Sequence, residues 1–307
     1  MINKYAVILS GILLIVILLI LLLDFFKKDL YENIEAILSN GKENAIVVLT
    51  RGYENIEKYE ELINRNDAIY EVYYNKLSDP DKMDVIIFHE GNINEEHQAY
   101  IKSRTPKLPL QFIAVNFYNN TNTNERCPPT NLSSRFDMGY KNMCYFWSID
   151  FLHYLKNYKY IIRIDEDCII RKLDPNILDD YGDRNILYSF ADFNWENNID
   201  DPDVIIGLRE LFEEFMEKND ITPYKSHDQI RCPYTNFMIV NIESIYNNKV
   251  IMSILNEIEK SNCIFSNRWG DLPIWGYILS LLVDEKYYLK DENIKYRHGS
   301  HDIEINI

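Results

Sequence analysis

Short apolar runs alternate with helix-like segments through the first half of this sequence. In the helix-like segments, apolar residues recur three or four positions apart, first between Ile56 and Ile63, and further helices are predicted over 94–104 and Met143–Leu155. The apolar runs are short and bounded by polar residues, which is typical of buried strands: Asn44–Arg51, Asp84–Gly91, Leu110–Phe117 and Tyr160–Ile164. Strands that alternate with helices predict an α/β fold with a mainly parallel sheet.

The N-terminal segment has a different character. Ala6–Leu23 is an apolar run of 18 residues without a charge, and as a helix it would span roughly 27 Å, close to the ~30 Å hydrocarbon core of a bilayer. The run continues into Asp24 and the basic pair Lys27–Lys28 without a small-residue cleavage site, so an uncleaved transmembrane anchor is predicted. A long signal peptide and a buried soluble helix are the alternatives. Positive charges flank the run on both sides and leave its orientation undecided.

The charge balance narrows the classes of ligand. The chain has 48 acidic and 32 basic residues and a formal net charge of −16. So acidic a surface repels phosphate backbones and anionic lipid, which argues against nucleic-acid binding. A phosphate-bearing ligand would need a metal ion or a few placed cations. The hydrophobic content of 47% is ample for a packed core.

Three carboxylates, Asp165, Glu166 and Asp167, directly follow the apolar run Tyr160–Ile164. Ligands of open α/β sheets bind beyond the carboxyl ends of the strands. In an extended chain, Asp165 and Asp167 would point the same way and Glu166 away from them. Two convergent carboxylates suit a hard cation such as Mn²⁺ or Mg²⁺. The alternative is an exposed strand end, since the same acidic spacing recurs around Pro80 and Pro202 without a preceding core strand.

Several motifs in a fixed order then point to a family. The segments GYKNMCYFWSIDFL, NYKYIIRIDEDC, YTNFMIVNIESIY, NRWGDLPIWGYILSLL and IKYRHGSHD follow one another along the chain. Their order and spacing resemble glycosyltransferase family 15, the α-1,2-mannosyltransferases that use GDP-mannose. The resemblance extends over about 45–301.

The resemblance implies a GT-A fold and a retaining, metal-dependent transfer of mannose from GDP-mannose to a glycan or glycoprotein acceptor, with Mn²⁺, or alternatively Mg²⁺, as cofactor. It also implies type II membrane topology: a cytoplasmic tail at 1–5, a signal anchor at 6–23, a stem at 24–43 and a catalytic domain at 44–307 in a Golgi- or ER-like lumen. Two glycosylation sequons, at Asn119 and Asn131, agree weakly with a lumenal location.

Site residues are carried over by position. Asp165, Asp167 and His298 fall on the metal ligands of the family, and His301 is a nearby competitor for His298. Asp271 of the Arg-Trp-Gly-Asp motif is the expected catalytic carboxylate, acting on the acceptor hydroxyl, although an aspartate before Pro273 also suits a helix cap. Nucleotide-sugar contacts are expected from five residues, for some of which surface exposure or core packing is the alternative: Arg51, Tyr140, Lys141, Asp165 and Trp269.

This chain also departs from the family pattern. Glu166 replaces a proline, Lys141 and Tyr145 replace two arginines, and Met238 stands where the family has a glutamate. Lysine cannot copy the bidentate phosphate contact of arginine. These changes leave two alternatives open: a membrane-anchored carbohydrate-binding pseudo-enzyme on the same fold, and a glycosyltransferase for another sugar nucleotide. A two-metal phosphoesterase is disfavoured, since the chain has only six histidines.

The five cysteines do not have the spacing of a zinc site. Cys144 and Cys232 fall on cysteine positions of the family, and the resemblance therefore implies a disulfide between them.

Overall fold

The computed structural model of the protein describes residues 41–193 and 202–306. The expected anchor at 6–23 and nearly all of the expected stem lie outside these residues. Within the described ranges, no helix combines the length and the apolar character needed to cross a bilayer.

The core of the fold is a seven-stranded sheet with the strand order β3-β2-β1-β4-β7-β6-β8. Strands β1 to β4 run parallel to their neighbours in this group, β7 is antiparallel to both β4 and β6, and β8 is parallel to β6. The bounds are β1 Asn44–Thr50, β2 Met83–His89, β3 Leu110–Ala114, β4 Tyr160–Ile164, β6 Tyr188–Phe190, β7 Phe237–Asn241 and β8 Tyr288–Lys290. The mainly parallel α/β architecture is therefore as predicted.

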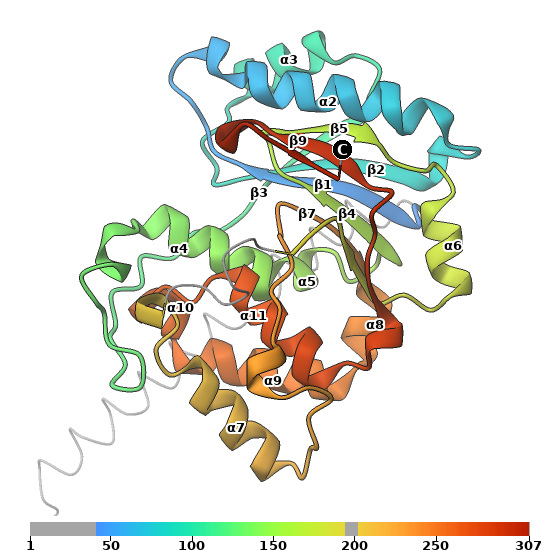
Figure 1. The fold of residues 1–307 in the computed structure, drawn as a ribbon. Helices are drawn as coiled ribbons and strands as arrows, with labels where there is room; N and C mark the ends of the chain where they lie inside the picture. Colours follow the sequence, from blue (N-terminus) through green and yellow to red (C-terminus); the bar gives the residue numbers. More distant parts are fainter. Residues whose placement is uncertain (1–40, 194–201, 307) are drawn as a thin grey trace, which may run out of the picture. The chain divides into compact units, whose positions relative to one another are not determined.

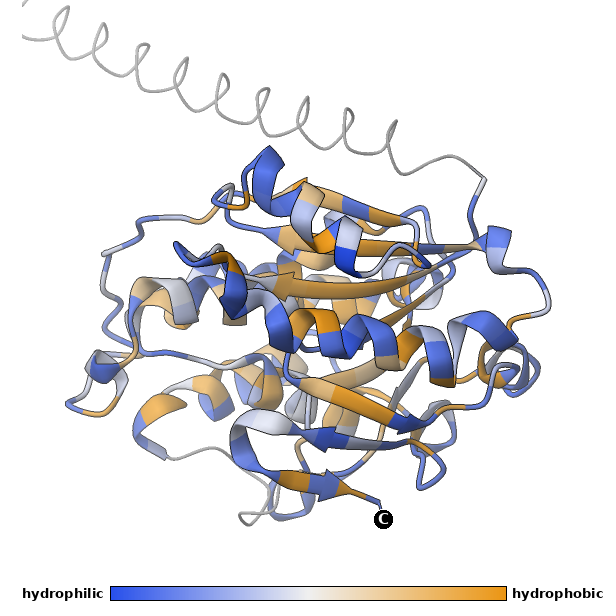
Figure 2. Ribbon diagram, turned by 90° about the horizontal axis from the view of Figure 1, so that it is seen from above, coloured by the Kyte–Doolittle hydropathy of each residue, from blue (hydrophilic) through white to orange (hydrophobic). Residues whose placement is uncertain are grey.

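Helices cover both faces of this sheet, which explains why its central strands are apolar on both sides (Figure 1). On one face, Ile46 and Val48 of β1 share a buried cluster with Leu62 of α2. On the other, Phe88 of β2 packs against Phe146, with ring centroids 5.1 Å apart. The helices are α2 Glu60–Val72, α3 Glu95–Arg104, α4 Met138–Tyr145, α5 Phe151–Tyr154, α6 Ile177–Asp183, α7 Leu208–Lys218, α8 Ile242–Asn247, α9 Lys249–Ser261, α10 Cys263–Ser266 and α11 Asp271–Tyr277. In Figure 2, hydrophobic residues are concentrated in the strands, whereas the helices carry both hydrophobic and hydrophilic residues.

A second, three-stranded sheet has the order β10-β9-β5 and is antiparallel. Strand β5 (Cys168–Lys172) begins directly after the acidic triplet, β9 spans Lys295–His298, and β10 spans Ile303–Ile305. Pairing of β5 with β9 places Cys168 opposite His298. This small sheet thus brings a C-terminal segment beside the carboxyl end of β4.

The predicted strands agree with β1 to β4 apart from their ends. The predicted helix Met143–Leu155 begins earlier, at Met138, where the Asp137 side chain accepts a hydrogen bond from the Tyr140 amide at 2.8 Å. It continues through a π-helical segment, Phe146–Asp150, into α5. The pattern located the apolar face of this helix but not its cap.

The predicted disulfide between Cys144 and Cys232 is wrong. The disulfide joins Cys127 and Cys263, whose Cα atoms are 5.7 Å apart, while Cys144 and Cys232 are buried elsewhere. It ties the loop after β3 to the start of α10. The family positions pointed to cysteines that fill the core, and no spacing rule identifies the true pair.

Candidate functional site

A cavity of about 740 Å³ opens at the carboxyl ends of the central strands. Thr50, Arg51 and Tyr53 line it from the end of β1, and the acidic triplet lines it from the end of β4. The remaining lining comes from strands β1, β4 and β9, from α2, from the segments after β2, β3 and β9, and from α4 with its flanking residues: Leu49, Glu61, Glu90, Phe117, Asp137, Gly139, Tyr140, Met143, Trp147, Arg163, His298 and Ser300. This is the edge of the sheet where ligands of open α/β folds bind.

The acidic triplet forms a turn and not the extended segment that was expected. Glu166 and Asp167 have turn geometry, and the Cys168 amide donates to the Asp165 carbonyl at 3.1 Å. Side chains therefore do not alternate here, so the premise by which Asp165 and Asp167 would share one face is wrong. The three carboxylates reach three different sets of partners, and all three line the cavity.

Asp165 is held by an arginine of its own strand. Arg163 donates to both carboxylate oxygens of Asp165, at 2.8 and 3.1 Å, and to Asp271 at 2.7 Å. The Arg163 guanidinium also lies 4.3 Å from the centre of the Trp147 ring. Burial raises the pKa of the Asp165 carboxyl, and the adjacent Arg163 opposes that rise only in part. Burial would lower the pKa of Arg163, but the two carboxylates outweigh it and raise that pKa above its ordinary value.

Asp271 is not a helix cap. It is the first residue of α11, and Gly270 occupies the cap position without a side-chain bond. The Asp271 side chain is 8% exposed, is bound to Arg163, and is not part of the cavity lining. The Arg163 side chain, 3% exposed, thus connects the end of β4 to the Arg-Trp-Gly-Asp motif.

Glu166 turns toward β1. Tyr53 donates to one carboxylate oxygen at 2.7 Å, and Thr50 donates to the other. Burial raises the pKa of the Glu166 carboxyl, while the bonds from Thr50 and Tyr53 lower it. Although Glu166 points away from the partners of Asp167, as expected, it lines the same cavity.

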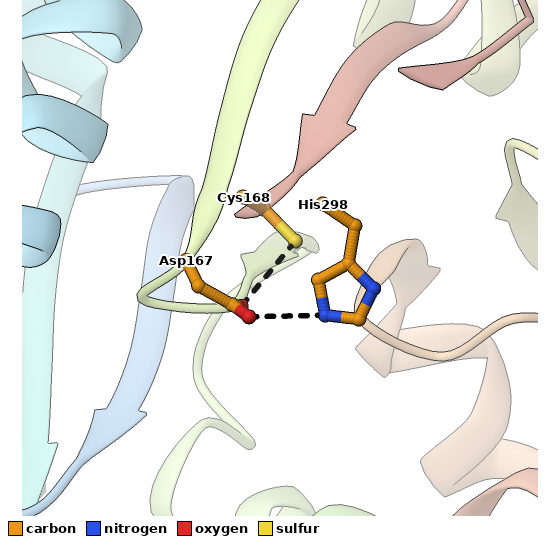
Figure 3. Close-up of side chains that lie close together, drawn as sticks. All are labelled: Asp167, Cys168 and His298. Carbon is orange, nitrogen blue, oxygen red and sulfur yellow. Dashed lines mark hydrogen bonds and ion pairs between the residues drawn. The ribbon is translucent and has the colours of Figure 1, made fainter. Parts of the chain in front are cut away.

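Asp167 faces His298 across the small sheet, as Figure 3 shows. The Asp167 carboxylate lies 3.1 Å from His298 Nε2 and accepts the Ser300 amide at 3.2 Å. Burial opposes ionisation, but His298 and Ser300 outweigh it and lower the pKa of Asp167 to about 2. The Gly299 amide donates to the Asp167 carbonyl at 2.7 Å, and a Cβ atom on Gly299 would lie only 3.1 Å from that oxygen. A glycine therefore permits this close approach.

His298 is supported from its other ring nitrogen. The Tyr234 hydroxyl lies 2.7 Å from Nδ1, and the His298 side chain is only 9% exposed. Nε2 is thereby directed toward Asp167. The Cys168 thiol lies 3.9 Å from Asp167, and one ligand atom each from Asp167, Cys168 and His298 lie within 4.8 Å of one another. These three residues could hold a metal ion. Burial raises the pKa of the Cys168 thiol.

The structure brings Arg51, Tyr140, Asp165, Asp167 and His298 to one cavity, but it does not bring Lys141 or Trp269 there. The Lys141 ammonium is buried and donates to the Phe265 carbonyl at 2.7 Å. Trp269 is fully buried, and its indole N–H donates to the Ile206 carbonyl at 2.9 Å. Neither side chain lines the cavity, so their contact with the nucleotide sugar stays a prediction.

Sequence reasoning gave no site role to Arg163, Tyr53, Thr50, Tyr234 or Ser300. Only Arg163 left a signal in the sequence, as the single polar residue of a strand that is otherwise apolar. A charge in a core strand requires a buried partner, and an acidic triplet two positions later supplies one. The other four become neighbours only through tertiary pairing.

Met238, where the family has a glutamate, lies opposite Arg163 in the β4–β7 ladder. Its side chain is fully buried, and the Tyr188 hydroxyl lies 3.0 Å from its sulfur. An uncharged, buried methionine side chain thus occupies the position where the family has a glutamate, and it offers no charge to Arg163.

Comparisons with known proteins agree with this fold. No protein-family model matches the sequence. Two curated proteins of Saccharomyces cerevisiae (strain ATCC 204508 / S288c) are similar to this chain. The probable mannosyltransferase KTR4 is 24% identical over 182 residues, which cover 52% of this chain and 38% of that protein. The probable mannosyltransferase KTR5 is 35% identical over 69 residues, which cover 22% of this chain and 13% of that protein. The chain thus matches well under half of the length of either relative.

Solved structures extend the comparison. Core-mannan synthase A (CmsA/Ktr4) from Aspergillus fumigatus, in its Mn/GDP form, superposes with a TM-score of 0.68 at 20% identity, covering 84% of this chain and 74% of that one. The S. cerevisiae mannosyltransferase Ktr4p in complex with GDP gives a TM-score of 0.67 at 19% identity, covering 84% and 71%.

The fold is therefore the GT-A fold of glycosyltransferases. The resemblance to glycosyltransferase family 15 is confirmed, because the chain is homologous to the probable mannosyltransferases KTR4 and KTR5 and shares the fold of the Ktr4 structures.

Proposed function

We propose that this chain is a metal-dependent retaining glycosyltransferase that transfers mannose from GDP-mannose to a glycan or glycoprotein acceptor. The observation that carries the proposal is the cavity at the carboxyl ends of β1 and β4, with Arg51, the acidic turn and His298 in its wall. The homology to mannosyltransferases and the Mn/GDP form of one similar structure support the choice of donor and cation.

The charge of the cavity explains why a cation is needed. Six carboxylates line it against two guanidinium groups, so a diphosphate would meet net negative charge. Asp167 and His298 offer oxygen and nitrogen ligands 3.1 Å apart, which fits a divalent ion such as Mn²⁺ or Mg²⁺. Asp165 is proposed as a further ligand. A bound cation would neutralise the charge that develops on the departing diphosphate.

The protein residues have distinct tasks in this proposal. Arg51 and Tyr140, which both line the cavity, bind the nucleotide sugar. Asp271 is proposed as the carboxylate that orients the acceptor hydroxyl. It lies outside the cavity lining and is held by Arg163 at 2.7 Å, so this role requires the Arg163–Asp271 pair to open toward the cavity when the acceptor binds. Because Met238 offers no carboxylate, a covalent sugar intermediate at that position is excluded. Retention without a covalent intermediate would have the acceptor attack from the face that the diphosphate leaves.

The experiment is calorimetric titration of the full chain with GDP-mannose, with and without Mn²⁺, and with a UDP-sugar as the competing donor. We expect Mn²⁺-dependent binding of GDP-mannose, loss of binding in Asp167→Asn, and normal binding in Asp81→Asn. Asp81 is a matched control, because it belongs to an exposed acidic pair with the same spacing. Binding of the UDP-sugar alone would overturn the donor, and binding of neither would overturn the function.

A carbohydrate-binding pseudo-enzyme is the second candidate, and the buried Met238 is the observation that favours it. Release of free GDP from GDP-mannose in the presence of Mn²⁺ separates the two functions. Tight donor binding without hydrolysis or transfer would support the pseudo-enzyme.

The membrane topology is part of the proposal. Residues 6–23 are proposed as a signal anchor that places residues 44–307 in the lumen of the Golgi or endoplasmic reticulum, with 1–5 in the cytoplasm. Protease protection of the folded domain in sealed microsomes is the expected result, and digestion from outside would reject this orientation.

A further inference from the structure

Arg268 of the Arg-Trp-Gly-Asp motif has a strained backbone. Its φ angle is 105°, in a region that glycine adopts readily but that a residue with a long side chain rarely does. This residue belongs to the turn between α10 and α11, in which the three amides of residues 267–269 donate to the Cys263 carbonyl at 3.0, 3.2 and 3.4 Å. Backbone strain persists only where the surrounding structure imposes it, and it is concentrated at functional sites. An arginine at a position that suits glycine indicates that its side chain has a task.

The Arg268 side chain reaches α4, which lies beside α10 in Figure 1. Its guanidinium carbon lies 4.4 Å from the centre of the Phe136 ring and 4.9 Å from the centre of the Tyr140 ring, and one guanidinium N–H donates to the Tyr140 hydroxyl. Arg268 is 9% exposed and does not line the cavity, whereas Tyr140 does. Arg268 therefore contacts the cavity wall without being part of it.

The chemistry of the two groups fixes the direction of their hydrogen bond. A guanidinium group carries donors only, so the Tyr140 oxygen must be the acceptor. The hydroxyl proton of Tyr140 consequently cannot point at Arg268 and is directed to another acceptor. A diphosphate or sugar in the cavity would supply such an oxygen.

We propose that Arg268 is a positioning residue for the nucleotide sugar: it fixes the Tyr140 ring in the cavity wall and makes the Tyr140 hydroxyl a donor to the ligand. This inference rests on the proposed function, in which Tyr140 binds the nucleotide sugar. What is new is the residue that sets this contact. It explains why a strained position carries an arginine, because glycine would relieve the backbone but could not reach Tyr140.

Calorimetric titration of the full chain in detergent, with GDP-mannose and Mn²⁺, tests the proposal. Arg268→Met keeps a long side chain that can pack on both rings but has no donor, and Tyr140→Phe removes only the hydroxyl. Each variant should bind GDP-mannose about tenfold more weakly, which is the effect of losing one hydrogen bond to a charged group. Arg104→Met is the matched control and should bind as the wild type does. Arg104 lies 5.6 Å from the centre of the Tyr100 ring and donates to its hydroxyl at 2.6 Å, but neither residue lines the cavity.

Three readouts separate this role from a merely structural one. If Arg268 acts through the Tyr140 hydroxyl, the double variant Arg268→Met/Tyr140→Phe should lose about tenfold in affinity, and not the roughly hundredfold of two independent contacts. The affinity for Mn²⁺ alone should be unchanged in both single variants, because neither residue belongs to the acidic turn. Arg268→Gly, which relieves the backbone, should bind GDP-mannose at least as weakly as Arg268→Met.

Unchanged binding of GDP-mannose by Tyr140→Phe overturns the proposal, and this variant loses a single oxygen atom, so the result does not depend on whether Arg268→Met folds. Wild-type affinity in Arg268→Met or Arg268→Gly also overturns it, as does a double variant whose losses add in full. In each of these cases the wild type still binds GDP-mannose, and the proposed function stands. If the wild type and Arg104→Met bind no GDP-mannose, the proposed function fails and this inference fails with it.

Discussion

Replacing Arg163 with methionine tests the buried ion network under the cavity. Methionine keeps much of the length of arginine and can still pack on Trp147, but it removes the charge that Asp165 and Asp271 share. The Arg163 and Asp271 side chains are 3% and 8% exposed, while that of Asp165 is 27% exposed. Asp271 would therefore be left buried without a cation, and Asp165 could regain part of its hydration from the cavity.

The expected loss of stability follows from these exposures. Two unit charges about 4 Å apart interact by roughly 4 kcal/mol at an effective dielectric constant of ~20. Removing one partner from a buried pair typically costs about 3–5 kcal/mol. Asp271 is counted fully and Asp165 is discounted because it keeps part of its hydration. We therefore expect Arg163→Met to lower the free energy of unfolding by about 4 kcal/mol. For a domain of this size, each kcal/mol lowers the melting temperature by about 2–4 °C, so the melting temperature should fall by about 8–16 °C.

Urea unfolding and thermal melting of the full chain, followed by circular dichroism, measure this effect. Arg171→Met is the matched control. Arg171 forms an ion pair with Glu304, and the two side chains are 49% and 35% exposed, so this substitution should lower the free energy of unfolding by at most about 1 kcal/mol. The double variant Arg163→Met/Asp271→Asn should recover more than half of the loss. A single variant that melts within about 2 °C of the wild type, or a double variant without recovery, would refute the reasoning.

Three further outcomes are expected. Mn²⁺ at about 100 times its dissociation constant should stabilise the wild type and Asp81→Asn by about 2.7 kcal/mol in thermal melting but leave Asp167→Asn unchanged, and an equal shift in all three would reject Asp167 as a ligand. Without metal, the pKa of Asp167 near 2, lowered from 3.8, contributes about 2 kcal/mol that is present above pH ~4 and is lost as the pH falls toward 2. Asp167→Asn should accordingly flatten the acid limb of a stability–pH curve. The Cys127–Cys263 disulfide closes a loop with a sequence separation of 136, so replacing both cysteines with serine should lower the free energy of unfolding by about 3–5 kcal/mol in urea titrations, and a change below about 1 kcal/mol would contradict this.

The sequence was sufficient for the central strands because each is a continuous apolar run, which only a sheet covered on both faces can bury. It was also sufficient to place Asp165 and Asp167 at the ligand-binding edge. It was not sufficient for their directions, because the alternation rule assumes that the strand continues, whereas the chain turns at Glu166 and returns as β5.

The positions of Lys141 and Trp269 outside the cavity lining could not be predicted, for another reason. Whether a polar or aromatic side chain reaches a cavity depends on which element packs over it. The carbonyl of Phe265, which accepts the Lys141 ammonium, is 124 positions away in the sequence. Local pattern carries no information about such a contact. The same reason explains why the disulfide pairing was missed.

The small sheet has a consequence for the order of assembly. The bond from the Ser300 amide to Asp167 spans 133 positions in the sequence. Pairings over such distances form late, because the entropy cost of closing the loop comes before the favourable contacts are made. A chain whose main sheet has formed but whose β9 has not docked contains Asp167 without His298. A ligand that requires both residues therefore discriminates finished molecules from unfinished ones, and its supply draws late folding intermediates toward the native state by mass action.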